Sequence, residues 1–285
     1  MNKTKSTTLL IDPVDLSPGE IRRIPLTKEG NSWVEIEMAP EEIIDYGAKN
    51  FNKLFNLHPL EQGKIIMYEQ ELLSYRWHQS YLRTPQRDPA FPHSYMFSGY
   101  DESSINQELP SEFQVFYDFM LKRDARFNQI VANWYLDGND YIAQHSDCEL
   151  GMIPDAIVSM INFNRLNARE NCRVFKIQPK PTDVDVAEFQ AVSIVLRNGV
   201  MITMGGDTQK QFKHGVPKMS LSEGEAAPRF SLSFRQFAGV GGQGQSCRQL
   251  SDYRHSLHRQ PATGDSSSAG DEEQKGNELR FLQPV

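Results

Sequence analysis

The sequence has few cysteines, no long hydrophobic run and no excess of positive charge, and each shortage excludes a class of protein. Its three cysteines, Cys148, Cys172 and Cys247, are scattered and odd in number, which excludes a disulfide framework and a zinc ribbon. We therefore expect a reducing, intracellular setting, in the nucleus or the cytoplasm. No stretch approaches the roughly 18 to 20 apolar residues of a membrane-spanning helix, so we expect no membrane partner. The N-terminal residues are too polar for a secretory signal.

The charge balance is acidic, with a formal net charge of -7 over 285 residues. A protein that binds nucleic acid is usually basic, at least locally. The overall charge therefore gives no support for that partner, and such a partner has to be inferred from a local site. Hydrophobic residues make up 39% and charged residues 24% of the chain, which is typical of a globular protein.

The composition divides the chain into three parts. Residues 1–50 mix polar residues with proline and glycine, and we expect an irregular N-terminal arm with one strand near Ser32–Met38. Residues 51–238 carry the patterns of a folded domain. Residues 239–285 are rich in glycine, serine and charge. Because such a segment has too little apolar surface to offset the entropy of ordering, we predict a disordered tail. We expect a monomer.

Helical spacing of apolar residues comes early in the chain, and short β-branched runs follow it. Apolar residues recur at helical intervals in Glu41–Leu57 and Ser111–Arg126, which predicts two helices. Short runs separated by Gly, Pro, Asn and Asp predict strands near Ile130–Tyr135, Ala156–Phe163, Cys172–Ile177, Val192–Leu196, Val200–Met204 and Phe230–Phe237. Helices followed by strands favour an α+β fold, with helices packed on one face of a β-sandwich.

A possible metal site begins with His145 and Asp147, which stand two positions apart. Residues i and i+2 of an extended strand point the same way, so both side chains can reach one ion. His214 follows a later strand and can supply a third ligand. Two histidines and one carboxylate on one face leave open positions, the arrangement of non-haem Fe(II) oxygenases that bind a keto acid and O₂. Taken alone, the His-x-Asp pair also fits an ordinary histidine hydrogen-bonded to a nearby aspartate.

The segment from Arg229 to Arg235 alternates strictly between polar and apolar residues. Arg229, Ser231, Ser233 and Arg235 share one face, and the three residues between them form an apolar face that must be buried. A guanidinium donates two parallel hydrogen bonds to a carboxylate, so two arginines on one face suit the dicarboxylate 2-oxoglutarate. The alternative is a solvent-facing edge strand whose charges only oppose aggregation.

Several motifs in this order resemble the AlkB family. The segment from Asn133 to Glu149 resembles the family's Asn-x-Tyr, glycine turn and His-x-Asp, and Arg229–Arg235 resembles its Arg-x-Asn-x-Thr-x-Arg strand. The approach to His214 and the region around Tyr95 and Phe97 are also similar to this family, in its DNA-repair branch. The similarity covers roughly residues 70–237, and it departs from the family in a longer polar loop between Phe163 and Cys172.

The resemblance implies a double-stranded β-helix, or jelly roll, with N-terminal helices packed on one face. It implies Fe(II) as the metal, with 2-oxoglutarate and O₂ as co-substrates. It assigns roles to eleven residues. The implied metal ligands, also the catalytic residues, are His145, Asp147 and His214; the implied 2-oxoglutarate contacts are Asn133, Tyr135, Arg229, Ser231 and Arg235; the implied substrate contacts are Tyr95, Phe97 and Glu149. Arg229 would pair with the distal carboxylate, Arg235 with the one near the metal, and Ser231 stands where the family usually has Asn. Core packing for the two aromatics and a solvated charge for Glu149 remain the alternatives.

The implied activity is oxidative demethylation of alkylated nucleic-acid bases of the 1-methyladenine or 3-methylcytosine type, with release of formaldehyde, succinate and CO₂. A duplex buries its bases, so the expected partner is alkylated DNA or RNA presented as a single strand or a flipped base. A basic and aromatic stretch that includes Arg76, Arg83, Arg87, Tyr75, Trp77 and Tyr81 suits phosphate contact and base stacking. Two alternatives stay open: the same chemistry on a protein side chain or small molecule, and a non-catalytic binding protein.

Overall fold

The computed structural model describes residues 8–17, 19–67, 70–82, 107–149, 152–180, 189–220 and 225–238. These residues belong to one compact unit, residues 1–245, and a second unit comprises residues 246–285. The predicted tail, Tyr95, Phe97, Arg83 and Arg87 lie outside the described residues.

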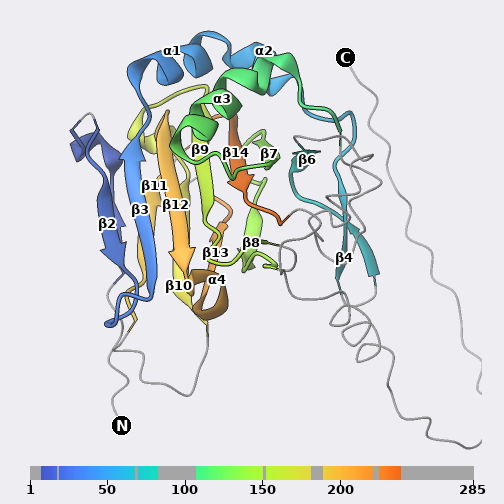
Figure 1. Cartoon of the computed structure of the whole chain (residues 1–285). Helices are drawn as coiled ribbons and strands as arrows, with labels where there is room; N and C mark the ends of the chain where they lie inside the picture. Colours follow the sequence, from blue (N-terminus) through green and yellow to red (C-terminus); the bar gives the residue numbers. More distant parts are fainter. Residues whose placement is uncertain are drawn as a thin grey trace, which may run out of the picture. The chain divides into compact units, whose positions relative to one another are not determined.

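Two sheets form the framework (Figure 1). The seven-stranded sheet has the order β2-β3-β12-β9-β14-β7-β6, and the five-stranded sheet has the order β1-β11-β10-β13-β8. The larger sheet contains β2 (Arg22–Pro25), β3 (Ser32–Met38), β6 (Trp77–Leu82), β7 (Gln129–Tyr135), β9 (Val158–Asn164), β12 (Val200–Gly206) and β14 (Arg229–Arg235). The smaller contains β1 (Leu9–Ile11), β8 (Ile142–His145), β10 (Val174–Pro179), β11 (Val192–Val195) and β13 (Phe212–Val216).

The chain passes repeatedly between the two sheets from β7 to β14. Strands β7, β9, β12 and β14 lie in the larger sheet, and β8, β10, β11 and β13 lie in the smaller one. This distribution of eight strands over two sheets, with β10 and β11 following each other in the smaller one, is the double-stranded β-helix, so the fold is α+β with a jelly-roll core, as expected. A separate hairpin pairs β4 (Lys64–Met67) with β5 (Gln70–Leu73).

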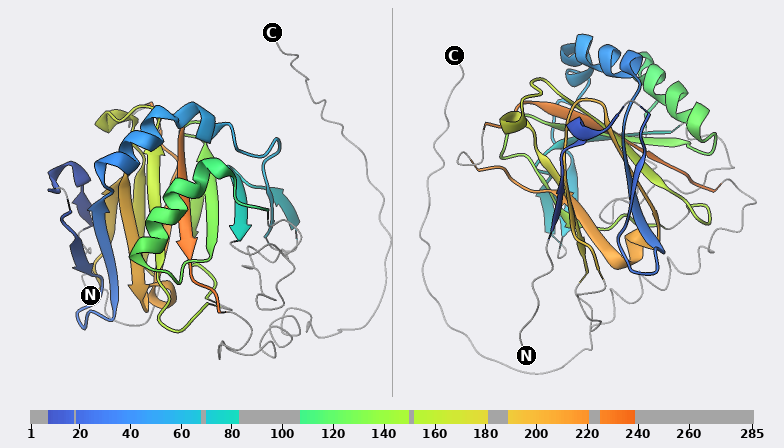
Figure 2. Two further views of the ribbon diagram at one scale, coloured as in Figure 1. Left: turned by 45° about the horizontal axis from the view of Figure 1, so that its top comes forward. Right: turned by 90° about the vertical axis from the view of Figure 1, so that its left-hand side faces the viewer.

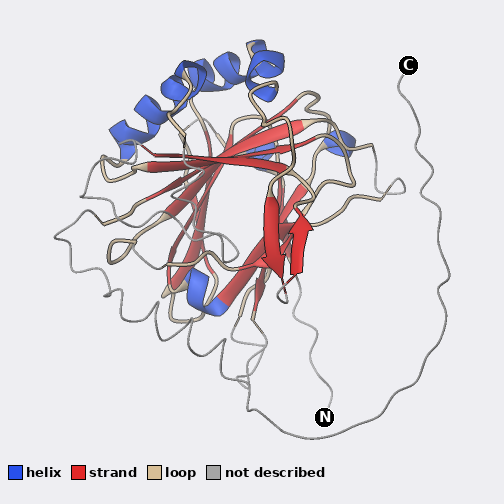
Figure 3. Ribbon diagram, turned by 90° about the vertical axis from the view of Figure 1, so that its right-hand side faces the viewer, coloured by secondary structure: helices blue, strands red, loops and turns tan. Residues whose placement is uncertain are grey.

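Helices cover one face of the larger sheet (Figures 2 and 3). They are α1 (Glu41–Lys49), α2 (Phe51–Phe55) and α3 (Gln114–Arg123), the last preceded by a 3₁₀ turn at Ser111–Phe113. The predicted single helix at 41–57 divides at Asn50, which leaves the helical conformation while its side-chain amide donates to the carbonyl of Tyr46. The predicted helix at 111–126 ends at Arg123 because Asp124 is extended.

The apolar residues form two cores on either side of the larger sheet. One lies between the sheets and includes Val158 and Met160; the other lies under the helices and includes Ile161, Phe163 and Phe230. Successive strand residues point to opposite faces, so β9 supplies both cores from one run. Among the described residues, no helix is both long and apolar enough to cross a membrane.

The N-terminal segment is more regular than the irregular arm that we predicted. The predicted strand at Ser32–Met38 is present as β3, which pairs along its length with β12. β2 adds to β3, and β1 pairs in parallel with β11. Val34 and Ile36 are fully buried, so burial against the sandwich orders a segment whose own sequence pattern is weak. The short helix α4 (Thr208–Gln211) follows β12.

Candidate metal centre

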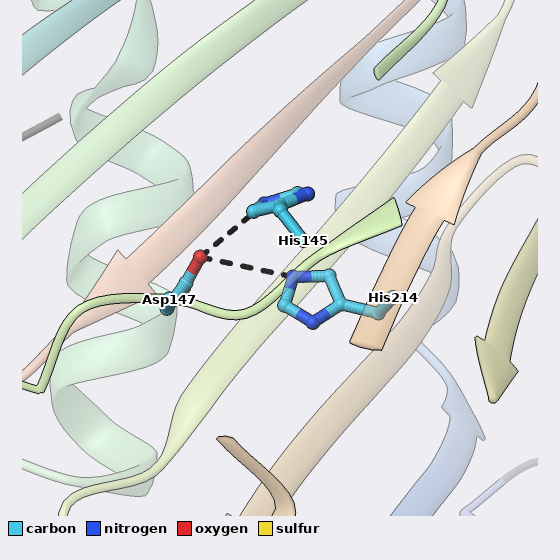
Figure 4. Close-up of side chains that lie close together, drawn as sticks. All are labelled: His145, Asp147 and His214. Carbon is cyan, nitrogen blue, oxygen red and sulfur yellow. Dashed lines mark ion pairs between the residues drawn. The ribbon is translucent and has the colours of Figure 1, made fainter. Parts of the chain in front are cut away.

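Two side chains that are close in the sequence and a third that is distant from them meet between the sheets (Figure 4). His145 ends β8, Asp147 follows two residues later, and His214 lies on the adjacent strand β13, directly opposite His145 in the register. Asp147 Oδ1 is 3.5 Å from His145 Nε2 and 3.7 Å from His214 Nε2. Metal bonds to such atoms are about 2.0–2.2 Å long, so the Asp147 carboxylate is close enough to each imidazole for the two to share an ion.

The protonation states of this cluster suit a cation. Burial lowers the pKa of His214 to about 3, with His145 lowering it further and Asp147 opposing. Burial by itself would raise the pKa of Asp147, but the charge of Arg235 and the two histidines outweigh it and hold that pKa well below its usual range. A neutral imidazole and an ionised carboxylate are the forms that bind metals. The three ligand atoms lie within 4.8 Å of one another, so the residues fit an Fe(II) ion.

Neighbouring groups fix the three side chains. His145 Nδ1 is 2.8 Å from the carbonyl of Ala143, which leaves Nε2 toward Asp147. Gln209 accepts a hydrogen bond of 2.8 Å from the backbone N–H of Asp147. Arg235 donates to Asp147 Oδ2 from Nε at 3.1 Å and from Nη2 at 2.7 Å. Such contacts hold ligands in place before the metal binds.

A pocket extends from these residues along the inner face of β14. Arg229, Ser231, Ser233 and Arg235 line it, while Phe230, Leu232 and Phe234 are buried under the helices. The alternating pattern therefore has the predicted orientation, and the edge-strand alternative is wrong, since β14 lies between β9 and β7. The other predicted co-substrate residues, Asn133 and Tyr135, line the same pocket from β7.

Arg229 has the features expected of an anion-binding group. It is fully buried, its Nε donates to Asn162 Oδ1 at 2.9 Å, and its guanidinium carbon lies 4.2 Å from the centre of the Tyr135 ring. Its two Nη atoms have no hydrogen-bond partner among the described residues. Burial lowers its pKa to about 10. A buried cation with unsatisfied donors suits a carboxylate arriving from outside.

Two predictions about the basic and aromatic stretch are wrong. Arg76 is 4% exposed, lines the pocket and donates to Asn133, so it does not face a phosphate backbone. Tyr81 is 3% exposed and packs in the core under the helices. Both lie on or beside β6, an edge strand that the sequence did not reveal because its residues are largely polar.

The remaining predicted residues have other surroundings. Glu149 lies two residues after Asp147 and is exposed as a whole residue. Partial desolvation of its carboxyl raises its pKa; the charge of Lys210 lowers this pKa, and the charge of Asp207 raises it. The polar loop after Phe163 contacts the turn at Arg197, whose Nη1 donates to the carbonyl of Asn167. Asn162 and Gln209 were missed, although a polar residue inside the apolar run of β9 was a usable signal for Asn162.

The comparison with known families agrees with this geometry. A profile of the 2OG-Fe(II) oxygenase superfamily matches residues 45–235, so the chain belongs to that superfamily, whose enzymes are dioxygenases that use Fe(II), 2-oxoglutarate and O₂. The expected enzyme class and cofactors are therefore confirmed.

Particular relatives confirm the resemblance to the AlkB family. The chain is 32% identical over 114 residues to the Alpha-ketoglutarate-dependent dioxygenase alkB homolog 3 of Homo sapiens, covering 38% of this chain and 36% of that one. It is 24% identical over 160 residues to the DNA oxidative demethylase ALKBH2 of Arabidopsis thaliana, covering 49% and 48%. The matches thus span only about a third to a half of these relatives.

A solved 2OG-Fe(II) oxygenase family oxidoreductase from Burkholderia pseudomallei is similar over 72% of this chain and 86% of its own. The sequence identity is 14% and the TM-score 0.40.

Proposed function

We propose that this chain is an intracellular dioxygenase that oxidatively demethylates alkylated bases of DNA or RNA. His145, Asp147 and His214 would hold Fe(II), which, with 2-oxoglutarate and O₂, supplies the oxidising power for hydroxylation of an N-methyl group. The hydroxymethyl product loses formaldehyde and leaves the free base. The convergence of these three side chains beside an arginine-lined pocket carries the proposal.

The residues of this chain would mainly position the reactants. Arg229 would neutralise the distal carboxylate of 2-oxoglutarate, and Ser231 with Tyr135 would donate hydrogen bonds along the pocket. Arg235 holds Asp147 ionised. Tyr95, Phe97 and Glu149 remain the proposed contacts to the base.

A pair of aromatic rings, one of them exposed, favours a nucleic-acid substrate. The ring of Tyr75, which is 55% exposed, stacks on Tyr141 at 4.7 Å, and Lys218 Nζ lies 5.5 and 5.1 Å from the two rings. Tyr75 and Tyr141 each adjoin a residue that lines the pocket, Arg76 and Ile142. An aromatic surface beside a cation suits a stacked base with its phosphate.

This surface gives a prediction that tests the substrate class. Tyr75→Ala should weaken binding of a single-stranded oligonucleotide by about 1–3 kcal/mol, the usual worth of a base–aromatic stack. Leu166→Ala is a matched control, because Leu166 is 54% exposed, close to the 55% of Tyr75, and has no aromatic ring on which a base could stack. Fluorescence anisotropy with a labelled oligonucleotide measures both. If Tyr75→Ala and the control bind the oligonucleotide with equal affinity, the Tyr75 ring does not stack on a base and no longer supports a nucleic-acid substrate.

The decisive assay for the activity uses single-stranded DNA and RNA that contain 1-methyladenine or 3-methylcytosine, with Fe(II), 2-oxoglutarate and air. We expect formaldehyde and succinate in equal amounts, together with restored adenine or cytosine. Succinate formation without loss of the methyl group would favour a protein or small-molecule substrate instead. No turnover of any substrate by the iron-loaded protein would favour a binding protein.

A further inference from the structure

Arg76 is a buried arginine for which the proposed chemistry has no role. It precedes β6, is 4% exposed, and lines the pocket together with His145 and Arg229. Its Nε donates to Asn133 Oδ1 at 2.7 Å, and its Nη1 donates to Ser74 Oγ at 3.3 Å. Asn133 pairs in register with both His78 of β6 and Ser231 of β14, so its side chain lies between the edge of the sheet and the strand that carries Arg229.

The contact with Arg76 determines which way the amide of Asn133 points. A guanidinium has five N–H donors and no acceptor, whereas an amide has one accepting oxygen and one donating NH₂ group. The amide atom that faces Arg76 must therefore be the oxygen, an assignment that follows from the network rather than from atom shapes. The NH₂ group is then directed away from Arg76, on a side chain that lines the pocket.

We propose that Arg76 is a positioning residue for 2-oxoglutarate: it holds Asn133 so that the amide presents its NH₂ group, a donor, to the co-substrate. The proposal rests on the assignment of Asn133 to the co-substrate. A carboxylate or keto group has only acceptor atoms, so a reversed amide would place oxygen against oxygen. Arg76 acts through Asn133 and, unlike Arg229, binds no carboxylate itself.

Three variants separate this role from a purely structural one. Arg76→Met removes the donor and allows the amide to reverse, which should raise the dissociation constant of 2-oxoglutarate about tenfold. Arg76→Lys keeps a donor and should stay within about threefold of the parent. Asn133→Asp keeps an acceptor for Arg76 but has no NH₂ group, so it should bind 2-oxoglutarate at least about tenfold more weakly.

The measurement is calorimetric titration of 2-oxoglutarate into each protein loaded with Mn(II), together with its melting temperature. The inference predicts that Asn133→Asp melts no lower than the parent, since the hydrogen bond from Arg76 is kept and becomes an ion pair, and yet loses affinity. Turnover should show a raised KM for 2-oxoglutarate with kcat changed less.

Two results would overturn the inference: Asn133→Asp binding 2-oxoglutarate as tightly as the parent, or a folded Arg76→Met doing so. If Arg76→Met does not fold, Asn133→Asp and Arg76→Lys decide the question. A parent protein that binds Mn(II) but no 2-oxoglutarate would instead refute the proposed function itself, so the two failures are distinguishable.

Discussion

Replacing each of the two arginines of β14 by methionine should change the stability of the metal-free protein in different directions. Arg229 and Arg235 stand on the same strand and line the same pocket. Arg235 is paired with the buried Asp147 carboxylate, whereas the Nη atoms of Arg229 have no hydrogen-bond partner among the described residues. If the pocket binds a dicarboxylate, the guanidinium of Arg229 should have no protein partner until the co-substrate carboxylate binds to it.

The magnitude for Arg229 follows from its pKa. Burial lowers that pKa to about 10, well below the ordinary value of a guanidinium, and one pKa unit corresponds to about 1.4 kcal/mol. The charged guanidinium therefore costs the empty protein on the order of 3 kcal/mol. Arg229→Met removes this cost but leaves Asn162 Oδ1 without its donor, a loss of about 1–3 kcal/mol. We expect a free energy of unfolding that is unchanged or up to about 2 kcal/mol higher.

Arg235→Met should have the opposite result. It leaves the Asp147 carboxylate, whose side chain is 1% exposed, without its arginine partner. Removing one partner of a buried ion pair costs about 3–5 kcal/mol of stability. In a protein of this size, 1 kcal/mol corresponds to roughly 2–4 °C in melting temperature. The two variants should therefore differ by at least about 6 °C.

Thermal unfolding of the metal-free parent and both variants tests this, followed by the same scans with Mn(II) and 2-oxoglutarate. The co-substrate should stabilise the parent but not Arg229→Met. If Arg229→Met unfolds as early as Arg235→Met, then Arg229 is an ordinary structural residue, and the argument for a carboxylate pocket is refuted.

Three further predictions concern the metal, the pH and the packing. His145→Ala should abolish turnover and metal binding while circular dichroism stays unchanged; retained activity would contradict the assigned ligand. Burial lowers the pKa of His78 to about 3, so only the unfolded chain gains a proton as the pH falls below about 6.5, and stability falls with it. Between pH 7 and 5, the free energy of unfolding of His78→Gln, measured in urea, should fall by about 2 kcal/mol less than that of the parent. Equal decreases would refute the assignment of this pH dependence to His78. Gly47→Ala places a Cβ 2.1 Å from the buried Phe163 ring and should lower the free energy of unfolding by about 1–3 kcal/mol, despite the better helix propensity of alanine. Urea unfolding measures this, and an unchanged midpoint would contradict this packing.

The sequence predicted most accurately those elements whose pattern repeats. Strict alternation located β14 and its two faces, and the run of β-branched residues located β12 and β9. β8 and β13, which carry His145 and His214, are short and partly polar, so neither was among the predicted strands, and the sequence identified only the two histidines that they carry. The shift in register between His214 and Val216 could not be inferred from spacing.

The environment of a polar residue was harder to predict than its position. Arg76 is followed by Trp77 and His78 in a stretch with the composition of a surface loop, yet pairing of β6 with β7 buries it beside Asn133. Whether a guanidinium faces solvent or a pocket depends on contacts across strands, which no single-strand pattern contains. The same reasoning applies to Asn162, whose partner Arg229 is 67 positions away.

Diffraction from crystals of the protein with Mn(II) and 2-oxoglutarate tests the central claim most directly. We predict one anomalous peak between His145, Asp147 and His214, with the far carboxylate of 2-oxoglutarate against Arg229. A peak at another site, or a co-substrate bound away from Arg229, would contradict it.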